Sequence, residues 1–322
     1  MSGGDWRPVA SLPVLRHRAL MLERAREYFR GCGVLEVETP VLSAAAVSDV
    51  NIESASARLC NTDRFLHTSP EYAMKRLLAA GYGDCMQVCR VFRDGERGRL
   101  HHPEFTLLEW YRVGFDAAAM MTDVEHLIGA MLRDLRSLPA ARRISYRAAF
   151  RMHAAVDPFE ADAAALRAVL ARAGVDCPTA VEGDRDALLD LIVGVLVGPR
   201  LGHDAPCFVT DYPASQAALA RLEAGDPSVA ERFELYLDGL ELANGFHELG
   251  DAAEQAQRFA DDQALRARRG LPLRPLDDRF LEALAAGLPD CSGVALGFDR
   301  LVMCATGAPS IDEVIAFPVE RA

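Results

Sequence analysis

The sequence lacks the features of a membrane or secreted protein. Its longest fully apolar run, Leu191 to Gly198, is far shorter than a membrane span. The first residues show no basic segment followed by an apolar one, so no signal peptide is expected. The eight cysteines are scattered, and the closest pair, Cys85 and Cys89, has neither zinc nor redox spacing. These absences predict a cytoplasmic protein with free thiols and no membrane partner.

The chain also lacks an excess of basic residues. It has 35 Lys plus Arg against 47 Asp plus Glu, which gives a net charge of −12. Binding the backbone of a nucleic acid requires clustered cations, so this balance argues against a large RNA partner. The chain is not short of apolar material: 322 residues, half of them apolar, are enough for one large domain or two small ones.

One stretch, Val91 to Arg112, departs from the acidic average because it carries several arginines and two adjacent histidines. The run Met86 to Phe92 suits a strand, and Glu104 to Tyr111 alternates with a period of two. Gly95 and Gly98 lie in the loop between them, which predicts a hairpin. The residues that would share one face of the second strand are Phe105, Leu107, Glu109 and Tyr111. A cationic loop in an acidic chain predicts an anionic ligand, and the alternative is a solvated hairpin tip.

Around this hairpin, the first two thirds of the chain show patterns of helices and of one extended segment. Ser11-Leu12-Pro13 is typical of a helix start, and the apolar residues that follow as far as Phe29 fall on one helical face. An extended segment over 34–42 comes next, and Tyr72 to Ala80 has a helical pattern. From about 117 to 201 the chain is rich in Ala and Leu with helical periodicity. We interpret this part as a mostly helical insertion with few candidate catalytic groups.

The last third contains a second hairpin. Asp238-Gly239 lies between two runs typical of strands, which is a strong two-residue turn signal. The residues that would share one face of the second strand are Asn244, Phe246 and Glu248. Glu241 would face the other way unless a bulge intervenes, and Gly245 is a candidate for one. Glu254 to Arg269 is predicted to be an exposed, charged helix.

Gly293 to Met303 is predicted to be a glycine-rich strand that breaks into a helix carrying Asp299-Arg300. Together with two earlier stretches it supports a family resemblance. GVLEVETPVL (33–42), FRDGERGRLHHPEF (92–105) and GVALGFDRLVM (293–303) resemble motifs 1, 2 and 3 of the class II aminoacyl-tRNA synthetases, in the family's order. The resemblance implies a single α+β catalytic domain over 1–322, with a mainly antiparallel sheet flanked by helices and a helical insertion at about 117–201.

Further stretches narrow the resemblance to the lysine subgroup. They are SPEYAMKRL (69–77), HHPEFTLLEWY (101–111), ELANGFHEL (241–249) and the final EVIAFP. Motif 1 begins near Gly33, so no anticodon-binding domain is expected ahead of it. This compact form, with PASQAALA (213–220), is similar to the paralogues that activate (R)-β-lysine or lysine with ATP and attach it to a lysine of elongation factor P. The alternatives are a truncated lysyl-tRNA synthetase that charges tRNA and a catalytically silent regulator that binds an amino acid.

The resemblance also implies roles for individual residues at the nucleotide. Arg93 would bridge the substrate carboxylate and the α-phosphate of ATP, and Arg300 would hold the outer phosphates; both are expected to be catalytic. The remaining residues expected to bind ATP are Glu96, His101, His102, Phe105, Glu241, Leu242 and Gly297. Mg²⁺ would be held by Glu241, with Glu248 sharing it.

The amino-acid pocket should be acidic, because the substrate has two ammonium groups. The residues that the resemblance assigns to it are Ser69, Pro70, Glu71, Glu109, Tyr111, Asn244, Glu248 and Ala295. Motif 1 in this family forms the dimer interface, so a homodimer is expected and tRNA is not expected as a partner.

Three positions depart from the family pattern. Gly95 stands where motif 2 usually has an acid, so either Glu96 replaces that acid through a shifted loop or the backbone contacts adenine. His102 stands where the subgroup has Asn. Ala295 replaces a glycine, and its methyl group is our candidate for selecting β-lysine over α-lysine.

Overall fold

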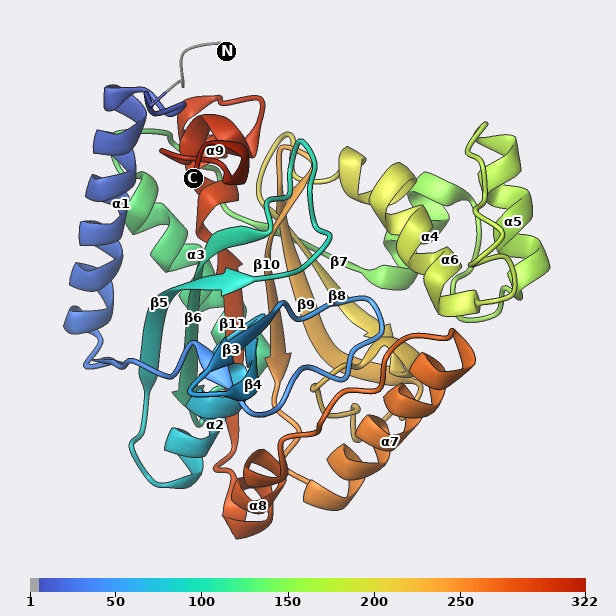
Figure 1. Cartoon of the computed structure of the whole chain (residues 1–322). Coiled ribbons are helices and arrows are strands. Elements are labelled where there is room, and N and C mark those ends of the chain that lie inside the picture. The colour runs from blue at the N-terminus through green and yellow to red at the C-terminus, as the bar shows by residue number, and fades with distance from the viewer. Residues whose placement is uncertain (1–5) are drawn as a thin grey trace, which may run out of the picture.

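The computed structural model describes residues 6–322 and is built on one large mixed sheet (Figure 1). The order of its eight strands is β1-β5-β6-β11-β10-β9-β8-β7. Only the two outer pairs, β1 with β5 and β7 with β8, are parallel, so the predicted mainly antiparallel sheet is confirmed. The strands of this sheet are β1 (Leu35–Glu36), β5 (Cys85–Phe92), β6 (Glu104–Val113), β7 (Arg142–Ser145), β8 (Cys207–Pro213), β9 (Val229–Leu237), β10 (Leu240–His247) and β11 (Cys291–Gly297). A small second sheet has the order β2-β4-β3, with β2 (Leu42–Ser43), β3 (Ser56–Leu59) and β4 (Thr62–Leu66).

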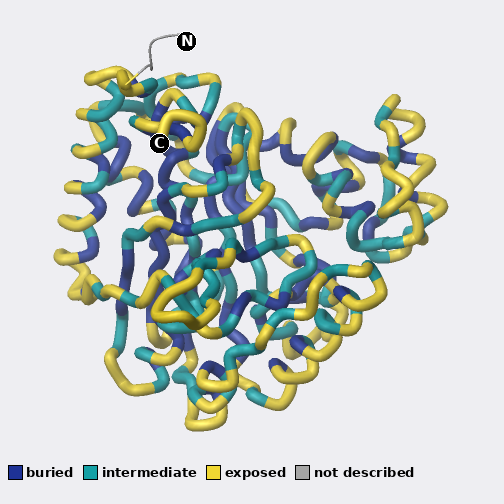
Figure 2. The backbone as a smooth tube through the Cα atoms, in the orientation of Figure 1, coloured by how far each residue is buried: buried dark blue, intermediate teal, exposed yellow. Residues whose placement is uncertain are grey.

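One face of the large sheet is covered by three helices, α1 (Leu12–Gly31), α3 (Ala117–Leu132) and α9 (Phe298–Thr306) (Figure 1). Their apolar sides and the central strands form the largest buried cluster, in which Phe29 packs edge-on against Trp110. Figure 2 shows these strands buried and the outer side of α1 exposed. The predicted helix start is confirmed, because the Ser11 side chain accepts a hydrogen bond from the Val14 backbone N–H.

A second group of helices forms a lobe beside the sheet: α4 (Tyr146–Ala154), α5 (Ala163–Arg172) and α6 (Arg185–Ile192) (Figure 1). A single π-helical turn (Val193–Val197) and a 3₁₀ turn (Gly198–Arg200) lead back to β8. The lobe has its own buried cluster, which reaches β8 and β9. The segment 117–201 is therefore not uniform, since α3 belongs to the main core and β7 to the sheet.

The opposite side of the molecule carries α2 (Glu71–Ala79), α7 (Ala252–Arg268) and α8 (Asp278–Gly287). Tyr72 of α2 stacks on Phe280 of α8, and Phe259 of α7 completes this small cluster. Short 3₁₀ turns span Ala214–Gln216, Ile311–Val314 and Val319–Arg321. Within residues 6–322 no helix combines the length and apolar character needed to cross a membrane. The eight cysteines are free thiols, as predicted.

Both predicted hairpins are present. Strands β5 and β6 pair antiparallel in one continuous register. Strands β9 and β10 are joined by Asp238 and Gly239, with φ angles of 54° and 76°, as a two-residue turn of this kind requires. The register between β9 and β10 slips between Glu241 and Ala243, so Leu242 is an extra residue in β10. The bulge is therefore at Leu242, and the prediction that placed it at Gly245 is wrong.

Gly245 has a different function. A Cβ atom at this position would lie 2.3 Å from the ring of Phe233, so glycine is required for close packing against β9. The bulge at Leu242 reverses the facing of the residues before it. Glu241 consequently lines the same cavity as Asn244, which a period of two alone does not predict.

Candidate active site

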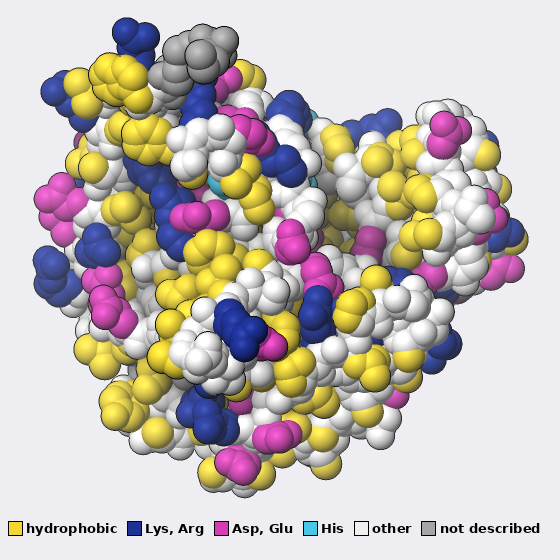
Figure 3. All heavy atoms as spheres, viewed as in Figure 1, with side chains coloured by type: hydrophobic (Ala, Val, Ile, Leu, Met, Phe, Trp, Pro, Cys, Tyr) yellow, Lys and Arg dark blue, Asp and Glu magenta, His cyan; other side chains and the backbone are white. Residues whose placement is uncertain are grey.

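A cavity of about 710 Å³ opens beside the sheet, within the size range of small-molecule sites. Its walls come from the β5–β6 hairpin, β9, β10, β11, the loop before β3, the loop after β8, α6 and α7. Figure 3 shows the surface hollowed next to the α4–α6 lobe. The predicted site residues that line the cavity are Ser69, Glu71, Arg93, Glu96, His101, His102, Phe105, Glu241, Leu242, Asn244, Ala295, Gly297 and Arg300. Four others are absent from its lining, namely Pro70, Glu109, Tyr111 and Glu248.

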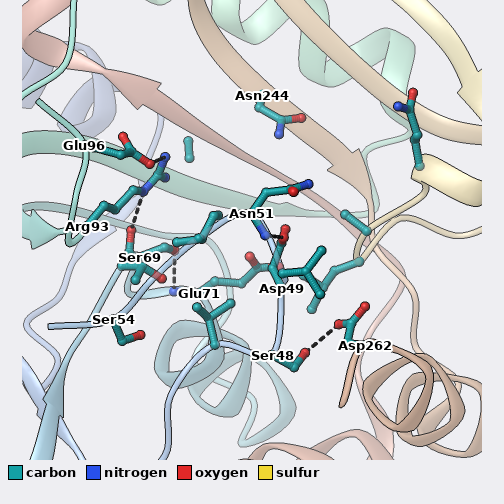
Figure 4. Close-up of a pocket in the computed structure, with 18 of the residues that line it drawn as sticks. Ser48, Asp49, Asn51, Ser54, Ser69, Glu71, Arg93, Glu96, Asn244 and Asp262 are labelled. Atoms are coloured by element: carbon teal, nitrogen blue, oxygen red, sulfur yellow. Dashed lines mark hydrogen bonds and ion pairs between the residues drawn. The ribbon is translucent and has the colours of Figure 1, made fainter. Parts of the chain in front are cut away.

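One end of the cavity is cationic. The Arg93 guanidinium lies 5.1 Å from the centre of the Phe105 ring and 3.8 Å from the Glu96 carboxylate. Figure 4 shows Arg93 and Glu96 together at this end, with Asn244 on the strand wall. The contacts of Arg93 with Phe105 and Glu96 are too long for strong hydrogen bonds, so its guanidinium keeps N–H donors available for an anion.

Arg300 is held more firmly. Its NH1 donates to the backbone carbonyl of Glu241 at 2.8 Å, and its NH2 lies 2.9 Å from His101 Nε2. Burial, with the nearby charge of Arg300, lowers the pKa of His101. The imidazole is therefore neutral at pH 7 and can accept the hydrogen bond from Arg300. Arg300 and His101 act as one preformed cationic group that faces the cavity.

His102 is engaged by the backbone. Its Nε2 accepts a hydrogen bond from the Val319 N–H at 2.9 Å, so Nδ1 carries the proton and donates to the Glu104 backbone carbonyl at 2.5 Å. Both ring nitrogens therefore fix the C-terminal segment against the hairpin, and only the ring itself is left to contact a nucleotide.

The loop from Asp94 to Arg99 contacts both the C-terminal segment and the cavity. Gly95 has a φ of +79°, a conformation that side chains rarely adopt, which accounts for glycine where the family usually has an acid. Arg97 pairs with Glu320 at 2.6 Å and with Asp312 at 2.7 Å, so it binds the C-terminal segment. Only Glu96 of this loop lines the cavity.

The other end of the site is a buried group of carboxylates. Ser69 Oγ donates to Glu109 at 2.7 Å, and the Tyr111 hydroxyl donates to the same carboxylate at 2.8 Å. Glu71 and Glu248 are joined by Lys75, whose Nζ lies 2.6 Å from Glu71 and 2.5 Å from Glu248. The period-two prediction that Glu109 and Tyr111 share a face is confirmed by their contact.

Burial dominates the electrostatics of this group. It raises the pKa of Glu109 to about 8, helped by the charge of Glu71. Burial likewise raises the pKa of Glu248 to about 8, although the charge of Lys75 opposes the shift. Glu248 Oε1 is buried and has no hydrogen-bond partner. An acceptor left without a donor in this way is costly, so it marks a place for a ligand N–H.

Gly293 on β11 provides the space for these side chains. A Cβ atom here would lie 2.2 Å from the Tyr111 ring and 2.4 Å from Glu248 Oε1. Glycine at position 293 thus allows the Tyr111 and Glu248 side chains to pack closely on this strand. At Gly297 the nearest atoms to a Cβ would be at 3.7 and 3.8 Å, which is ordinary contact, so the protein itself does not require glycine there.

Strand geometry separates Glu241 from Glu248. Glu241 is near the start of β10, beside Arg300 at 3.8 Å, and Glu248 directly follows the last residue of β10, against Lys75. At about 3.3 Å per residue this spacing is too long for one metal ion to bridge. This spacing argues against the prediction that Glu248 shares a metal ion with Glu241. Burial, and after it the charge of Glu234, raises the pKa of Glu241. No sequence pattern indicated this role for Glu234.

Comparison with known proteins now identifies the family. A family model described as tRNA synthetases class II (D, K and N) matches residues 5–321. The chain belongs to this family. It is also 49% identical over 323 residues to the elongation factor P--(R)-β-lysine ligases of Salmonella gallinarum (strain 287/91 / NCTC 13346) and Salmonella paratyphi B (strain ATCC BAA-1250 / SPB7), covering 98% of each chain. The predicted family and the predicted class II α+β fold are confirmed.

Residues of motif 2 (92–105) and motif 3 (293–303) line the cavity, whereas no residue of motif 1 (33–42) does. Other elements were missed. Arg232 on β9 donates to Asn244 Oδ1 at 3.2 Å and to Glu234 at 2.6 Å, so it orients an expected substrate contact. The helix α7 was predicted to be exposed, which is wrong for one face, because Gln255 and Arg266 are buried and Gln255 lines the cavity.

The loop before β3 was also missed as a wall of the cavity. Ser48 donates to Asp262 of α7 at 2.6 Å, as Figure 4 shows. Arg266 of α7 donates to the Asp49 carbonyl at 2.9 Å and to Glu53 at 2.7 Å.

Among the site contacts that the sequence analysis missed, only the ion pair of Glu71 and Lys75 could have been found from the sequence. Its signal is the i, i+4 spacing of opposite charges on one helix.

Proposed function

We propose that this chain activates (R)-β-lysine with ATP and transfers it to the ε-amino group of a lysine on elongation factor P. The observation that carries the proposal is a cavity with Arg93 and Arg300 at one end and Glu71 at the other, where the buried carboxylates of Glu109 and Glu248 lie next to its lining. Cations suit the triphosphate of ATP, and buried acids suit a substrate with two ammonium groups. The relatives' names supply the acceptor protein.

The first step joins the substrate to AMP. A carboxylate oxygen of β-lysine attacks the α-phosphorus, and the bond to pyrophosphate breaks. Attack of one anion on another requires that charge be neutralised. Arg93 would contact both the substrate carboxylate and the α-phosphate through its planar fork, with Phe105 stacked on adenine. Arg300, supported by His101, would hold the leaving pyrophosphate.

The second step moves the acyl group. The neutral acceptor amine attacks the carbonyl carbon of the adenylate, the bond to AMP breaks, and the amine loses a proton. Asn244, oriented by Arg232, would hold the carbonyl end of the substrate. Glu71, Glu109 and Glu248 would bind its two ammonium groups, so the reacting carbon is placed between the two ends of the site.

The residues present also suit Mg²⁺ at the nucleotide end. Glu241 lines the cavity and its carboxylate interacts electrostatically with that of Glu234, and carboxylate oxygens are the ligands that Mg²⁺ prefers. A bound Mg²⁺ would neutralise phosphate charge. The protein's own contribution is to hold Glu241 in place, through the bulge at Leu242 and the contact of Arg300 with its backbone carbonyl.

A homodimer is part of the proposal. Strand β1 is at one edge of the large sheet, and apolar side chains near that edge are exposed: Leu35, Tyr82 and Val113. Exposed apolar groups gathered at an edge strand are typical of an interface. We expect the protein to sediment as a dimer and the variant Leu35→Asp to shift it toward the monomer.

Pyrophosphate exchange with (R)-β-lysine, followed by mass analysis of elongation factor P, tests the proposal. We expect ATP-dependent exchange and acylation of one lysine of the factor. Translation factors act in the cytoplasm, so we expect this protein to be located there. Exchange followed by transfer to tRNA alone would instead indicate a truncated lysyl-tRNA synthetase. Binding of the amino acid with no exchange would indicate a silent regulatory paralogue.

A further inference from the structure

Lys75 is the only lysine in the chain, which otherwise uses arginine for its permanently charged basic side chains. It is also one of the most deeply buried side chains, with 1% of its surface exposed. A sequence that uses arginine at every other cationic position retains lysine at one buried site. An ammonium is a compact point charge with three donors, whereas a guanidinium is large and planar, so the site selects for the smaller cation.

The ion pairs of Lys75 are all with members of the carboxylate group of the amine pocket (Glu71, Glu109 and Glu248), and its ammonium also lies 5.9 Å from the centre of the Phe280 ring. Its Nζ bridges Glu71 and Glu248 at 2.6 and 2.5 Å. Among the ion pairs formed within residues 6–322, it is the only cation paired with any of the three pocket carboxylates, and Glu109 has only the hydroxyls of Ser69 and Tyr111. Glu248 Oε1 remains without a donor even though Lys75 holds the other oxygen.

We propose that Lys75 is a fixed counter-ion that sets the charge of the amine pocket. Three ionised carboxylates and one ammonium leave two negative charges, which match the two ammonium groups of a diamino acid substrate. Lys75 thus positions Glu71 and Glu248 and fixes how many protons the pocket exchanges when the substrate binds. The proposal rests on the proposed function in taking a diamino acid as the ligand.

The empty pocket keeps part of this charge neutralised by a proton. Burial raises the pKa of Glu109 to about 8, so near pH 7 this carboxyl group, which has no cation paired with it, retains a proton. An entering ammonium group favours the ionised carboxylate and expels that proton. For Lys75 itself, the charges of Glu248 and Glu71 outweigh burial and raise the pKa, so it stays charged.

The other titratable groups around the pocket stay neutral in this range. Burial raises the pKa of each of them above its ordinary value, which is already above 8. They are Tyr72, Tyr111, Cys85, Cys89 and Cys291. Protons released on binding therefore come from the carboxyl groups.

Calorimetric titration of (R)-β-lysine at pH 7, in buffers of different ionisation enthalpy, counts the protons released. Lys75→Met removes the charge and keeps a similar length. Without the counter-ion one more carboxyl group is protonated in the empty pocket, so we expect about one additional proton released per β-lysine bound. The KM for β-lysine should rise roughly tenfold or more, while the KM for ATP is unchanged.

The matched control is Arg76→Met, which removes a charge from the next residue of α2, where the side chain is exposed. It should leave the proton count at the wild-type value. The double variant Lys75→Met with Glu71→Gln restores the charge balance, and it should return the count toward that of wild type. This second variant carries the test if the single variant does not fold.

The single lysine allows a direct observation. Protein labelled with ¹³C-lysine should show one Cε signal, at the position of a charged amine across the stable pH range, and β-lysine should shift it. Equal proton counts for wild type and Lys75→Met would overturn the counter-ion role and leave Lys75 as packing only. Absence of any β-lysine binding to wild type would instead overturn the proposed function.

Discussion

The carboxylate of Asp299 accepts a hydrogen bond from the backbone N–H of Thr106 at 2.6 Å. Its other oxygen pairs with Arg18 of α1, and Arg18 also donates to the Thr106 hydroxyl at 2.6 Å. One buried carboxylate therefore joins the helix that precedes motif 1, the second strand of motif 2 and the helix of motif 3. It also precedes Arg300 directly, so its position determines where that cation lies.

Asp299→Asn should lower both stability and activity. The amide cannot accept from Thr106 and pair with Arg18 at full strength, and a buried charge left without its partner costs about 3–5 kcal/mol. We expect a loss of this order in urea unfolding. Pyrophosphate exchange should fall further than the folded fraction explains, because Arg300 moves. Exchange that follows the folded fraction would show that Asp299 is structural only.

Gly293→Ala should weaken binding of the amino acid specifically. The added methyl group would overlap the Tyr111 ring and Glu248 Oε1, so both must move out of the amine pocket. We expect the KM for β-lysine to rise by roughly 100-fold, the scale of a lost buried polar contact, with little change in the KM for ATP. Steady-state exchange kinetics measure both constants.

The matched variant at the nucleotide end of the cavity is Gly297→Ala, where an added Cβ atom would make only ordinary contacts. It should fold normally and raise the KM for ATP, since the family resemblance brings the nucleotide against this backbone. If Gly293→Ala raised the two KM values equally, the distortion would not be confined to the amine pocket.

Ala295→Gly should change the preference between lysine isomers. Ala295 lines the cavity, and in the sheet it is paired with Asn244 on one side and Glu109 on the other. Its methyl group thus lies between the residues expected to hold the carboxylate and an amine. A methyl group in such a pocket changes discrimination by roughly 1–3 kcal/mol, so we expect at least a tenfold shift toward α-lysine. Exchange assays with both isomers would refute this by showing an unchanged ratio.

Local patterns predicted the parts of this site that depend on neighbouring residues. The face shared by Glu109 and Tyr111 follows from the period of a strand, and the turn at Asp238-Gly239 follows from the φ angles that glycine and aspartate tolerate. The bulge at Leu242 has no such signal. The glycine that suggested a bulge, Gly245, is required instead by the ring of Phe233.

Contacts between distant segments account for what the sequence did not predict. Arg266 and Glu53 are 213 positions apart, yet their ion pair holds the loop before β3 against α7 as a wall of the cavity. Periodicity showed α7 only as a charged helix, because it cannot tell which charges will find buried partners. Lys75 was overlooked for the same reason, since a lysine beside a glutamate on a helix is usually a solvated pair.

The pH dependence of stability should report the buried carboxyl groups. Burial raises the pKa of Glu109 from 4.5 to about 8 in the folded protein. Between these values the folded state holds more protons than the unfolded state, so stability is highest at the acidic end and falls as the pH rises toward 8. We expect the free energy of unfolding to fall between pH 6 and pH 8.5 by less in Glu109→Gln than in wild type. Equal slopes in urea unfolding would show that Glu109 is ionised in the empty site.

The absence of exposed lysine leads to a final prediction about the product of the first step. An aminoacyl-adenylate acylates amines held near it, because proximity replaces a bimolecular encounter. Arg269 lines the cavity and pairs with Asp184, so Arg269→Lys would place a primary amine at the cavity wall. With ATP and β-lysine but no elongation factor P, we expect this variant to acquire an acyl group on Lys at position 269, detected by peptide mass analysis.

Arg64→Lys, which places a lysine on β4 outside the cavity lining, is the control and should remain unmodified. Equal labelling of both variants would mean that the adenylate escapes and reacts in solution, and labelling of neither would mean that the wall at position 269 lies out of reach of the activated carbonyl.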